Sequence, residues 1–118
     1  MEDTNRLIAE FMGYKVMKEN DFLNYNYPKN TNLDNIMIDV AMTYHKSWDW
    51  LMPVVEKIEG LAIEKYNPIK VEINGTSTYI KKASEPRFNI SRAYSVKSRI
   101  QATHKAVVEF IKWYNENK

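Results

Sequence analysis

The stretch that decides the fold is YHKSWDWLMPVVEKIE, residues 44–59. Its apolar residues recur at the i, i+3, i+4 and i+7 spacing of a helix with one buried face, at Leu51, Val54, Val55 and Ile58. We expect this helix to end at Gly60. Asp49 is the predicted N-cap, because Pro53 then lies where a missing N–H is tolerated. Ser47 as the cap would place Pro53 one turn deeper and imply a kink.

A second amphipathic helix is predicted from about Ser95 to Asn115. Its apolar stripe comprises Val96, Ile100, Thr103, Val107, Phe110, Ile111 and Tyr114. Together the two helices are expected to supply much of the core.

A β-hairpin is predicted between these helices. Ile69, Val71 and Ile73 alternate up to Asn74-Gly75, a pair that favours a type I′ turn. A two-residue loop at these positions would place Ile73 opposite Thr76.

The N-terminal half is read more coarsely. A short helix capped by Asp3 or Thr4 and ended by Gly13 precedes a strand over 14–18 and a loop over 24–32. Residues 36–44 alternate like a strand but also match a helical stripe; we favour a strand, and the helix remains open.

Residues 83–95 are predicted to be an irregular connection with a turn at Glu85-Pro86. The element order is then α-β-β-α-β-β-α. It predicts one globular domain over residues 1–118, an α+β three-layer α/β/α-type sandwich. Its antiparallel sheet would have about four strands, with three helices.

Three stretches of the chain carry a family resemblance: 5–14, 44–59 and 104–115. They resemble the small "phage ABA sandwich" domain proteins of phages and prophages of Bacteroidetes. The resemblance implies a three-layer sandwich, with helices outside a central sheet, and a phage genome as the source. It implies no catalytic residues, because the family's role is unassigned.

The composition excludes several classes of chemistry. The chain has no cysteine and three glycines, at positions too dispersed for a phosphate-binding loop. The missing cysteines fit the cytoplasm, expected here to be that of an infected host cell, and no segment resembles a membrane span. We expect no enzyme, no metal and no cofactor.

The two histidines offer little to a catalytic site. His45 and Asp49 could form a base–orienter pair, but Asp49 is more simply a helix cap, and His104 is expected on a helix surface. Glu56 and Glu59 are expected to be two solvated carboxylates.

Charge is unevenly distributed along the chain. Residues 1–59 carry 6 basic and 10 acidic side chains, whereas residues 60–118 carry 11 and 5. The basic excess is densest over 81–105, where planar side chains also occur. The ligand- or partner-binding residues predicted there are Arg87, Phe88, Arg92, Tyr94 and Arg99, and the secondary candidates are Tyr25, Tyr27 and Trp113.

Together with the phage source that the family resemblance implies, these observations favour a small non-enzymatic binding protein that acts in counter-defence or host interaction. Arginines would clamp the phosphate of a nucleotide-type signal, or the same residues would meet a host defence protein. Nucleic-acid binding is the second choice and a virion assembly accessory the third. A homo-oligomer is compatible with the sequence, and no membrane partner is expected.

Overall fold

The computed structural model describes residues 2–25, 27, 29, 32–64, 67–83 and 89–117. In chain order its helices and strands are α1 (Glu2–Phe11), β1 (Lys15–Met17), α2 (Glu19–Leu23), β2 (Ile36–Ile38), α3 (Trp48–Glu59), β3 (Ala62–Glu64), β4 (Asn67–Asn74), β5 (Ser77–Lys82), β6 (Asn89–Tyr94) and α4 (Arg99–Asn117). Short 3-10 turns, η1 (Leu33–Asn35) and η2 (Asp39–Ala41), flank β2.

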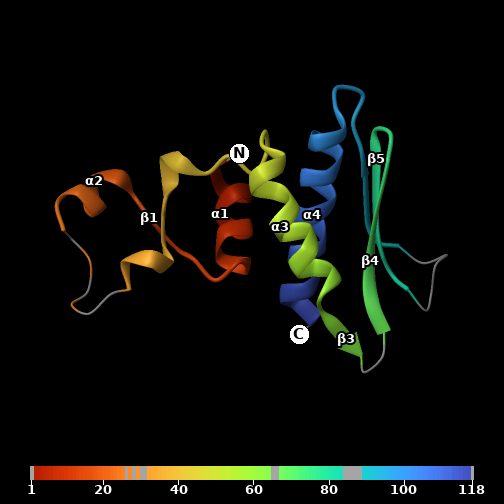
Figure 1. The fold of residues 1–118 in the computed structure, drawn as a ribbon, viewed down its shortest axis with the longest axis horizontal. Helices are drawn as coiled ribbons and strands as arrows, with labels where there is room; N and C mark the ends of the chain where they lie inside the picture. Colours follow the sequence, from red (N-terminus) through yellow and green to blue (C-terminus); the bar gives the residue numbers. More distant parts are fainter. Residues whose placement is uncertain are drawn as a thin grey trace.

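An antiparallel sheet with the strand order β3-β4-β5-β6 forms one side of the molecule. Figure 1 shows α3 and α4 side by side over one face of this sheet, with α1 beyond them. The predicted α+β sandwich is confirmed. The element order differs from the predicted one, because α2 lies between β1 and β2 and because β3 and β6 add two strands to the predicted hairpin. The strands β1 and β2 form a separate parallel pair.

The core lies between the sheet and the two long helices. Leu51, Val54, Val55 and Ile58 of α3 are all buried, as their spacing predicts. In α4, Val107, Phe110 and Ile111 are fully buried. Two hydrogen bonds also join α4 to the sheet: the Thr78 and Thr103 hydroxyls lie 2.8 Å apart, and the Ser91 hydroxyl donates to the Ala106 carbonyl at 2.8 Å.

The start of α3 corrects the predicted cap. The amides of Trp50 and Leu51 both donate to the Ser47 carbonyl, at 3.2 and 3.0 Å, so Ser47 and not Asp49 precedes the helix. Pro53 therefore lies inside α3. Because Asp49 and Pro53 are both exposed, water can satisfy the carbonyl that loses its partner.

The last helix begins four residues later than predicted, at Arg99. The Ser98 hydroxyl accepts a hydrogen bond from the Gln101 amide at 3.2 Å, which is the geometry of an N-cap. Val96, predicted to lie on the apolar stripe, precedes the helix and is 79% exposed.

The hairpin is present, but its turn lies one residue further along than predicted. Asn74 pairs with Ser77, and Ile73 pairs with Thr78 rather than with Thr76. Gly75 has φ +56° and, unlike a type I′ turn, no second turn residue has positive φ. Glycine at the first central position is the pattern of a type II′ turn. Each residue of the hairpin still lies on its predicted face, because pairing shifted by two positions keeps the side chains alternating as before.

Residues 89–94, predicted to be irregular, form strand β6 and pair antiparallel with β5. Ser91 and Ala93 face α4 and are buried, whereas Arg92 and Tyr94 are exposed. The sequence did not predict this strand because its inward-facing residues are small, and neither serine nor alanine has a strong preference for strands. The turn predicted at Glu85-Pro86 lies outside the described residues.

The N-terminal part corrects two further predictions. The first helix begins at Glu2, so neither Asp3 nor Thr4 is its cap, but Gly13 ends it with φ +95° as expected. Only Ile36–Ile38 of the predicted 36–44 strand is extended, and η2 follows it. The sequence also gave no sign of α2, which has only 5 residues.

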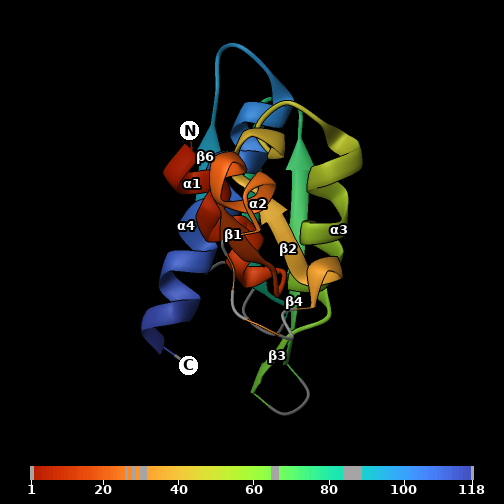
Figure 2. The ribbon, with the colours of Figure 1, turned by 90° about the vertical axis from the view of Figure 1, so that its left-hand side faces the viewer.

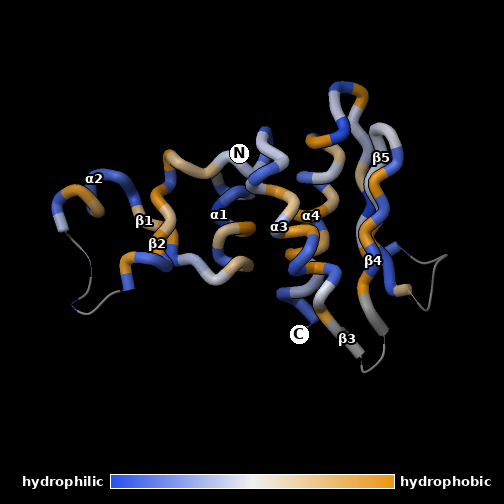
Figure 3. The backbone as a smooth tube through the Cα atoms, viewed as in Figure 1, coloured by the Kyte–Doolittle hydropathy of each residue, from blue (hydrophilic) through white to orange (hydrophobic). Residues whose placement is uncertain are grey.

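The described residues between 15 and 41 form a projecting unit that we call the arm. Figure 1 shows it standing away from the sheet and the long helices, beyond α1, and Figure 2 views the molecule from the side of the arm. The radius of gyration is 15.6 Å, against about 13.5 Å for a compact domain of this length. The arm accounts for this difference in shape, and Figure 3 shows hydrophobic positions along it.

Candidate functional site

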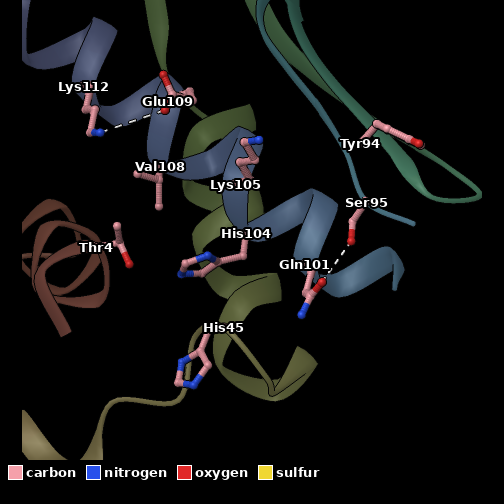
Figure 4. A pocket seen from close by; sticks show the side chains of 10 residues that line it. All are labelled: Thr4, His45, Tyr94, Ser95, Gln101, His104, Lys105, Val108, Glu109 and Lys112. Carbon is pink, nitrogen blue, oxygen red and sulfur yellow. Dashed lines mark hydrogen bonds and ion pairs between the residues drawn. The ribbon is translucent and has the colours of Figure 1, made fainter. Parts of the chain in front are cut away.

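A cleft of about 450 Å³ lies where the start of α1, the loop before α3 and the end of β6 meet α4. Figure 4 shows the side chains that line it: Thr4, His45, Tyr94, Ser95, Gln101, His104, Lys105, Val108, Glu109 and Lys112. We call it the α4 cleft, because α4 supplies six of these residues. Its volume falls in the range of small-molecule sites.

Behind the wall of the α4 cleft, Asn5 joins the two histidines. Asn5 is 2% exposed. Its Nδ2 lies 2.8 Å from His45 Nδ1, and its Oδ1 lies 3.0 Å from His104 Nε2. The Met42 carbonyl lies 3.5 Å from Asn5 Nδ2 and can only accept a hydrogen bond. The Asn5 atom that faces it is therefore the donor nitrogen of the side-chain amide. His45 Nδ1 therefore accepts and His104 Nε2–H donates.

Both imidazoles are held in the neutral form. Burial, and secondarily the nearby charge of His45, lowers the pKa of His104 from 6.5 to about 4. Burial, with a contribution from Lys46, also lowers the pKa of His45. A neutral His45 is what its hydrogen bond with the Asn5 amide requires, since a protonated Nδ1 could not accept.

The expectation that His104 lies on a helix surface is wrong. It is buried, because α1 packs against α4 at this point and Asn5 satisfies its ring. The alternative pair of His45 with Asp49 is not formed. The Nδ1 atom of His45 lies against the Asn5 amide instead, and Asp49 is exposed on α3.

Two lysines give the α4 cleft a positive rim. Lys112 Nζ lies 3.9 Å from Glu109 Oε1, a loose ion pair on the surface of α4. Lys105 is exposed and forms no ion pair with the other described residues. Its charge is therefore available to a ligand.

A second hollow of about 380 Å³ adjoins the α4 cleft and shares Tyr94 and Lys105 with it. Arg92 and Tyr79 also line this hollow. Tyr94 is 63% exposed at the boundary between the two. An exposed aromatic ring that shares a hollow with cationic side chains can stack on a planar group while the cations meet an anion.

The structure brings together only part of the predicted site. Arg92 and Tyr94 lie two residues apart on the exposed side of β6. Arg99 lines neither hollow, and its Nε donates to the Gly75 carbonyl at 3.0 Å, which ties α4 to the hairpin turn. Arg87 and Phe88 lie outside the described residues.

The secondary candidates are also dispersed. Tyr25 and Tyr27 lie on the arm with ring centroids 6.3 Å apart, and Tyr27 lies 6.1 Å from Phe22. Trp113 is half-buried with its ring 6.0 Å from that of Phe110, and it lines a further hollow of about 350 Å³ with Arg92.

Sequence reasoning missed Asn5 and Lys105. Asn5 occupies the same buried face of α1 as Ile8 and Ala9, three and four residues on. His104 likewise lies on the buried face of α4, three and four residues before the buried Val107 and Val108. A polar residue at a core position of each of two helices was the available signal, because such residues need a hydrogen-bond partner inside the protein.

Comparison with protein-family models, with curated proteins and with solved structures found no match. The resemblance to the phage ABA sandwich domain proteins therefore stays a prediction. Among the described residues, no cluster of three or more His, Asp or Glu side chains is arranged to hold a metal ion. In the same part of the chain, no helix is both long and apolar enough to cross a bilayer.

Proposed function

We propose that this chain is a non-enzymatic binding protein that takes a small anionic ligand with a planar ring in the α4 cleft. The observation that carries the proposal is the placement of Tyr94 between the α4 cleft and the adjoining hollow, with Lys105 lining both. A nucleotide fits this chemistry, because its base can stack on the tyrosine while its phosphate meets the cations.

The polar lining supports the same class of ligand. Ser95 and Gln101 already hydrogen-bond each other at 2.9 Å at one end of the α4 cleft. Lys105 contributes positive charge along its α4 side, where Lys112 is loosely paired with Glu109. Arg92, in the adjoining hollow, can form two parallel hydrogen bonds with a phosphate.

Binding is favoured over catalysis because Asn5 engages one nitrogen of each imidazole. Those hydrogen bonds hold α1 and the loop before α3 against α4, which is a structural role for both histidines. In the phage setting that the sequence resemblance implies, such a protein would sequester a nucleotide signal of the host.

The test is calorimetric titration of the purified chain with nucleoside phosphates, with the matching nucleosides and with inorganic phosphate. We expect the nucleotide to bind more tightly than either of its parts, because stacking and charge contacts then act together. The double variant Tyr94→Ala/Lys105→Ala should weaken binding at least about tenfold, equal to about 1.4 kcal/mol.

The matched control is Tyr25→Ala/Lys18→Ala, which removes an exposed tyrosine and an exposed lysine from the arm. It should bind like the wild type. Equal binding by the wild type and the Tyr94/Lys105 variant would refute the site. Binding of single-stranded DNA that weakens steeply with salt, with no nucleotide binding, would instead identify a nucleic-acid protein.

A further inference from the structure

A pocket of about 230 Å³ lies where the arm joins the rest of the molecule. The residues that line it come from separate stretches of the chain: Met12, Tyr14, Met37, Tyr44, Asp49, Trp50 and Pro53. We call it the Trp50 pocket. It shares no residue with the α4 cleft or with the hollow beside that cleft, so it is a separate candidate site. Its volume is below the range of about 300–1,000 Å³ for drug-sized ligands and suits a single small group.

Three aromatic side chains line the Trp50 pocket. The rings of Tyr44 and Trp50 are nearly perpendicular, at 84°, and their centroids lie 5.2 Å apart. Burial, with a smaller contribution from the nearby Tyr14, raises the pKa of Tyr44 to about 12, so its ring stays neutral. The face of a neutral aromatic ring carries partial negative charge and attracts organic cations. Several rings at one small pocket therefore favour a cationic group.

The charge of the Trp50 pocket favours the same ligand. Asp49 lies in the first turn of α3, is exposed and forms no ion pair with the other described residues. Among the residues that line the pocket, none is basic. Pro53 has no N–H, so the Asp49 carbonyl, four residues before it, lacks its usual helical partner. A carboxylate and a carbonyl oxygen are thus available to a positive charge, whereas an anion would be repelled.

The remaining side chains distinguish between kinds of cation. Met12, Met37 and Pro53 give the pocket a wall that is apolar and, at the two thioethers, polarizable. A primary ammonium is strongly hydrated and has three N–H donors, which such a wall cannot satisfy. A quaternary ammonium has no donor, and its methyl groups can contact the wall while its charge meets the rings.

The walls of the Trp50 pocket are fixed by the fold. The amides of Met12 and Tyr14 donate to the carbonyls of Ile8 and Ala9, at 3.0 and 2.9 Å, which anchors this segment to α1. Tyr44 is 3% exposed and belongs to the hydrophobic core. A ligand would therefore enter a largely preformed site and lose little binding energy to the ordering of side chains.

We propose that the Trp50 pocket binds a quaternary ammonium group, with the aromatic rings around its methyl groups and Asp49 beside its charge. This site is independent of the α4 cleft, whose rim is positive and which takes an anion. The same group occurs in small choline-type molecules and on trimethylated lysine side chains, and the pocket recognises the chemistry that they share.

NMR titration of the full chain with choline tests the proposal, and the indole N–H signal of Trp50 is the reporter. Its neutral isostere, 3,3-dimethyl-1-butanol, has the same shape without the charge. Choline should shift the Trp50 signal saturably and bind at least about tenfold more tightly than the isostere. Equal binding of the two compounds, or no shift with choline at millimolar concentration, would overturn the proposal.

Substitutions assign the binding to the Trp50 pocket. Trp50→Leu keeps an apolar side chain but removes the ring, and it should weaken choline binding at least about tenfold. Asp49→Asn should weaken choline binding about threefold and leave binding of the isostere unchanged. The matched control is Glu56→Gln, which removes an exposed carboxylate of α3 outside the pocket and should change neither. Circular dichroism checks that each variant is folded.

The two carboxylate variants decide the outcome even if Trp50→Leu fails to fold. Because Asp49 and Glu56 are both exposed, neither substitution should disturb the core. An equal effect of both on choline binding would reduce the attraction to the general charge of the surface and refute the site. A trimethyl-lysine peptide, compared with free choline, identifies the source of the group: the tighter ligand is the natural kind. Binding of neither would overturn the proposal.

Discussion

The strongest test of the buried Asn5–histidine cluster is its response to pH. His104 has a pKa of about 4 in the folded chain and an ordinary value near 6.5 when unfolded. Between these values the unfolded chain binds more protons, so stability must fall as the pH falls. The stability that the chain has with His104 neutral is therefore fully present above pH 6.5, and it is lost progressively as the pH falls toward 4.

The magnitude follows from the two pKa values. At pH 5 a single group with these values costs about 2 kcal/mol of unfolding free energy relative to neutral pH. One side of the ring faces the open α4 cleft, where water lessens the penalty for a charge. We therefore expect a loss of between about 1 and 2 kcal/mol from His104 alone. This is a large part of the total stability of a domain of this size.

Urea denaturation at pH 7.5 and pH 5 measures the effect, with His104→Gln as the reference. Glutamine does not titrate, and its amide can still donate a hydrogen bond to Asn5 Oδ1. Because the carboxylates titrate alike in both proteins, the difference between their pH dependences isolates His104. The wild type should lose about 1–2 kcal/mol more than His104→Gln. Parallel pH profiles for the two proteins would show that the ring is not held neutral and would refute the reasoning.

Two further predictions concern the fold itself. Gly75→Val should destabilise the chain by about 1–3 kcal/mol in thermal or urea unfolding, because valine resists the positive φ of the turn. Thr76→Val, at the next turn position, should cost far less, and equal losses would contradict the turn assignment. Phe110→Ala should cost about 3–5 kcal/mol, since the ring is fully buried, whereas Val96→Ala should be nearly neutral. Wild-type stability of Phe110→Ala would mean that α4 packs through another face.

The features that the sequence predicted well depend on strong apolar periodicity. The buried faces of α3 and α4 follow from apolar residues spaced three and four positions apart. The hairpin faces were likewise predicted correctly, although the turn was misplaced by one residue. Asn74-Gly75 and Gly75-Thr76 both supply glycine to a two-residue turn, and local preference alone cannot choose between them.

The missed features depend on contacts between distant segments. Strand β6 has Ser91 and Ala93 on its inner side, where space beside α4 is small and the Ser91 hydroxyl finds the Ala106 carbonyl. Nothing local identifies such a strand. The α4 cleft was missed for the same reason, because Asn5 and His104 are 99 residues apart in the chain and meet only after α1 packs on α4.

The Asn5–histidine cluster links the stability of the fold to the shape of the α4 cleft. Asn5 belongs to α1, His45 to the loop before α3 and His104 to α4, so one amide fixes the relative positions of three segments. Two of the three residues also line the cleft. Protonation of His45 would remove the acceptor that Asn5 needs, and the loop before α3 would lose its hold on α1. Acid should therefore open the α4 cleft before it unfolds the sheet, whose contacts with α4 through Thr103 and Ser91 involve no group that titrates in this range.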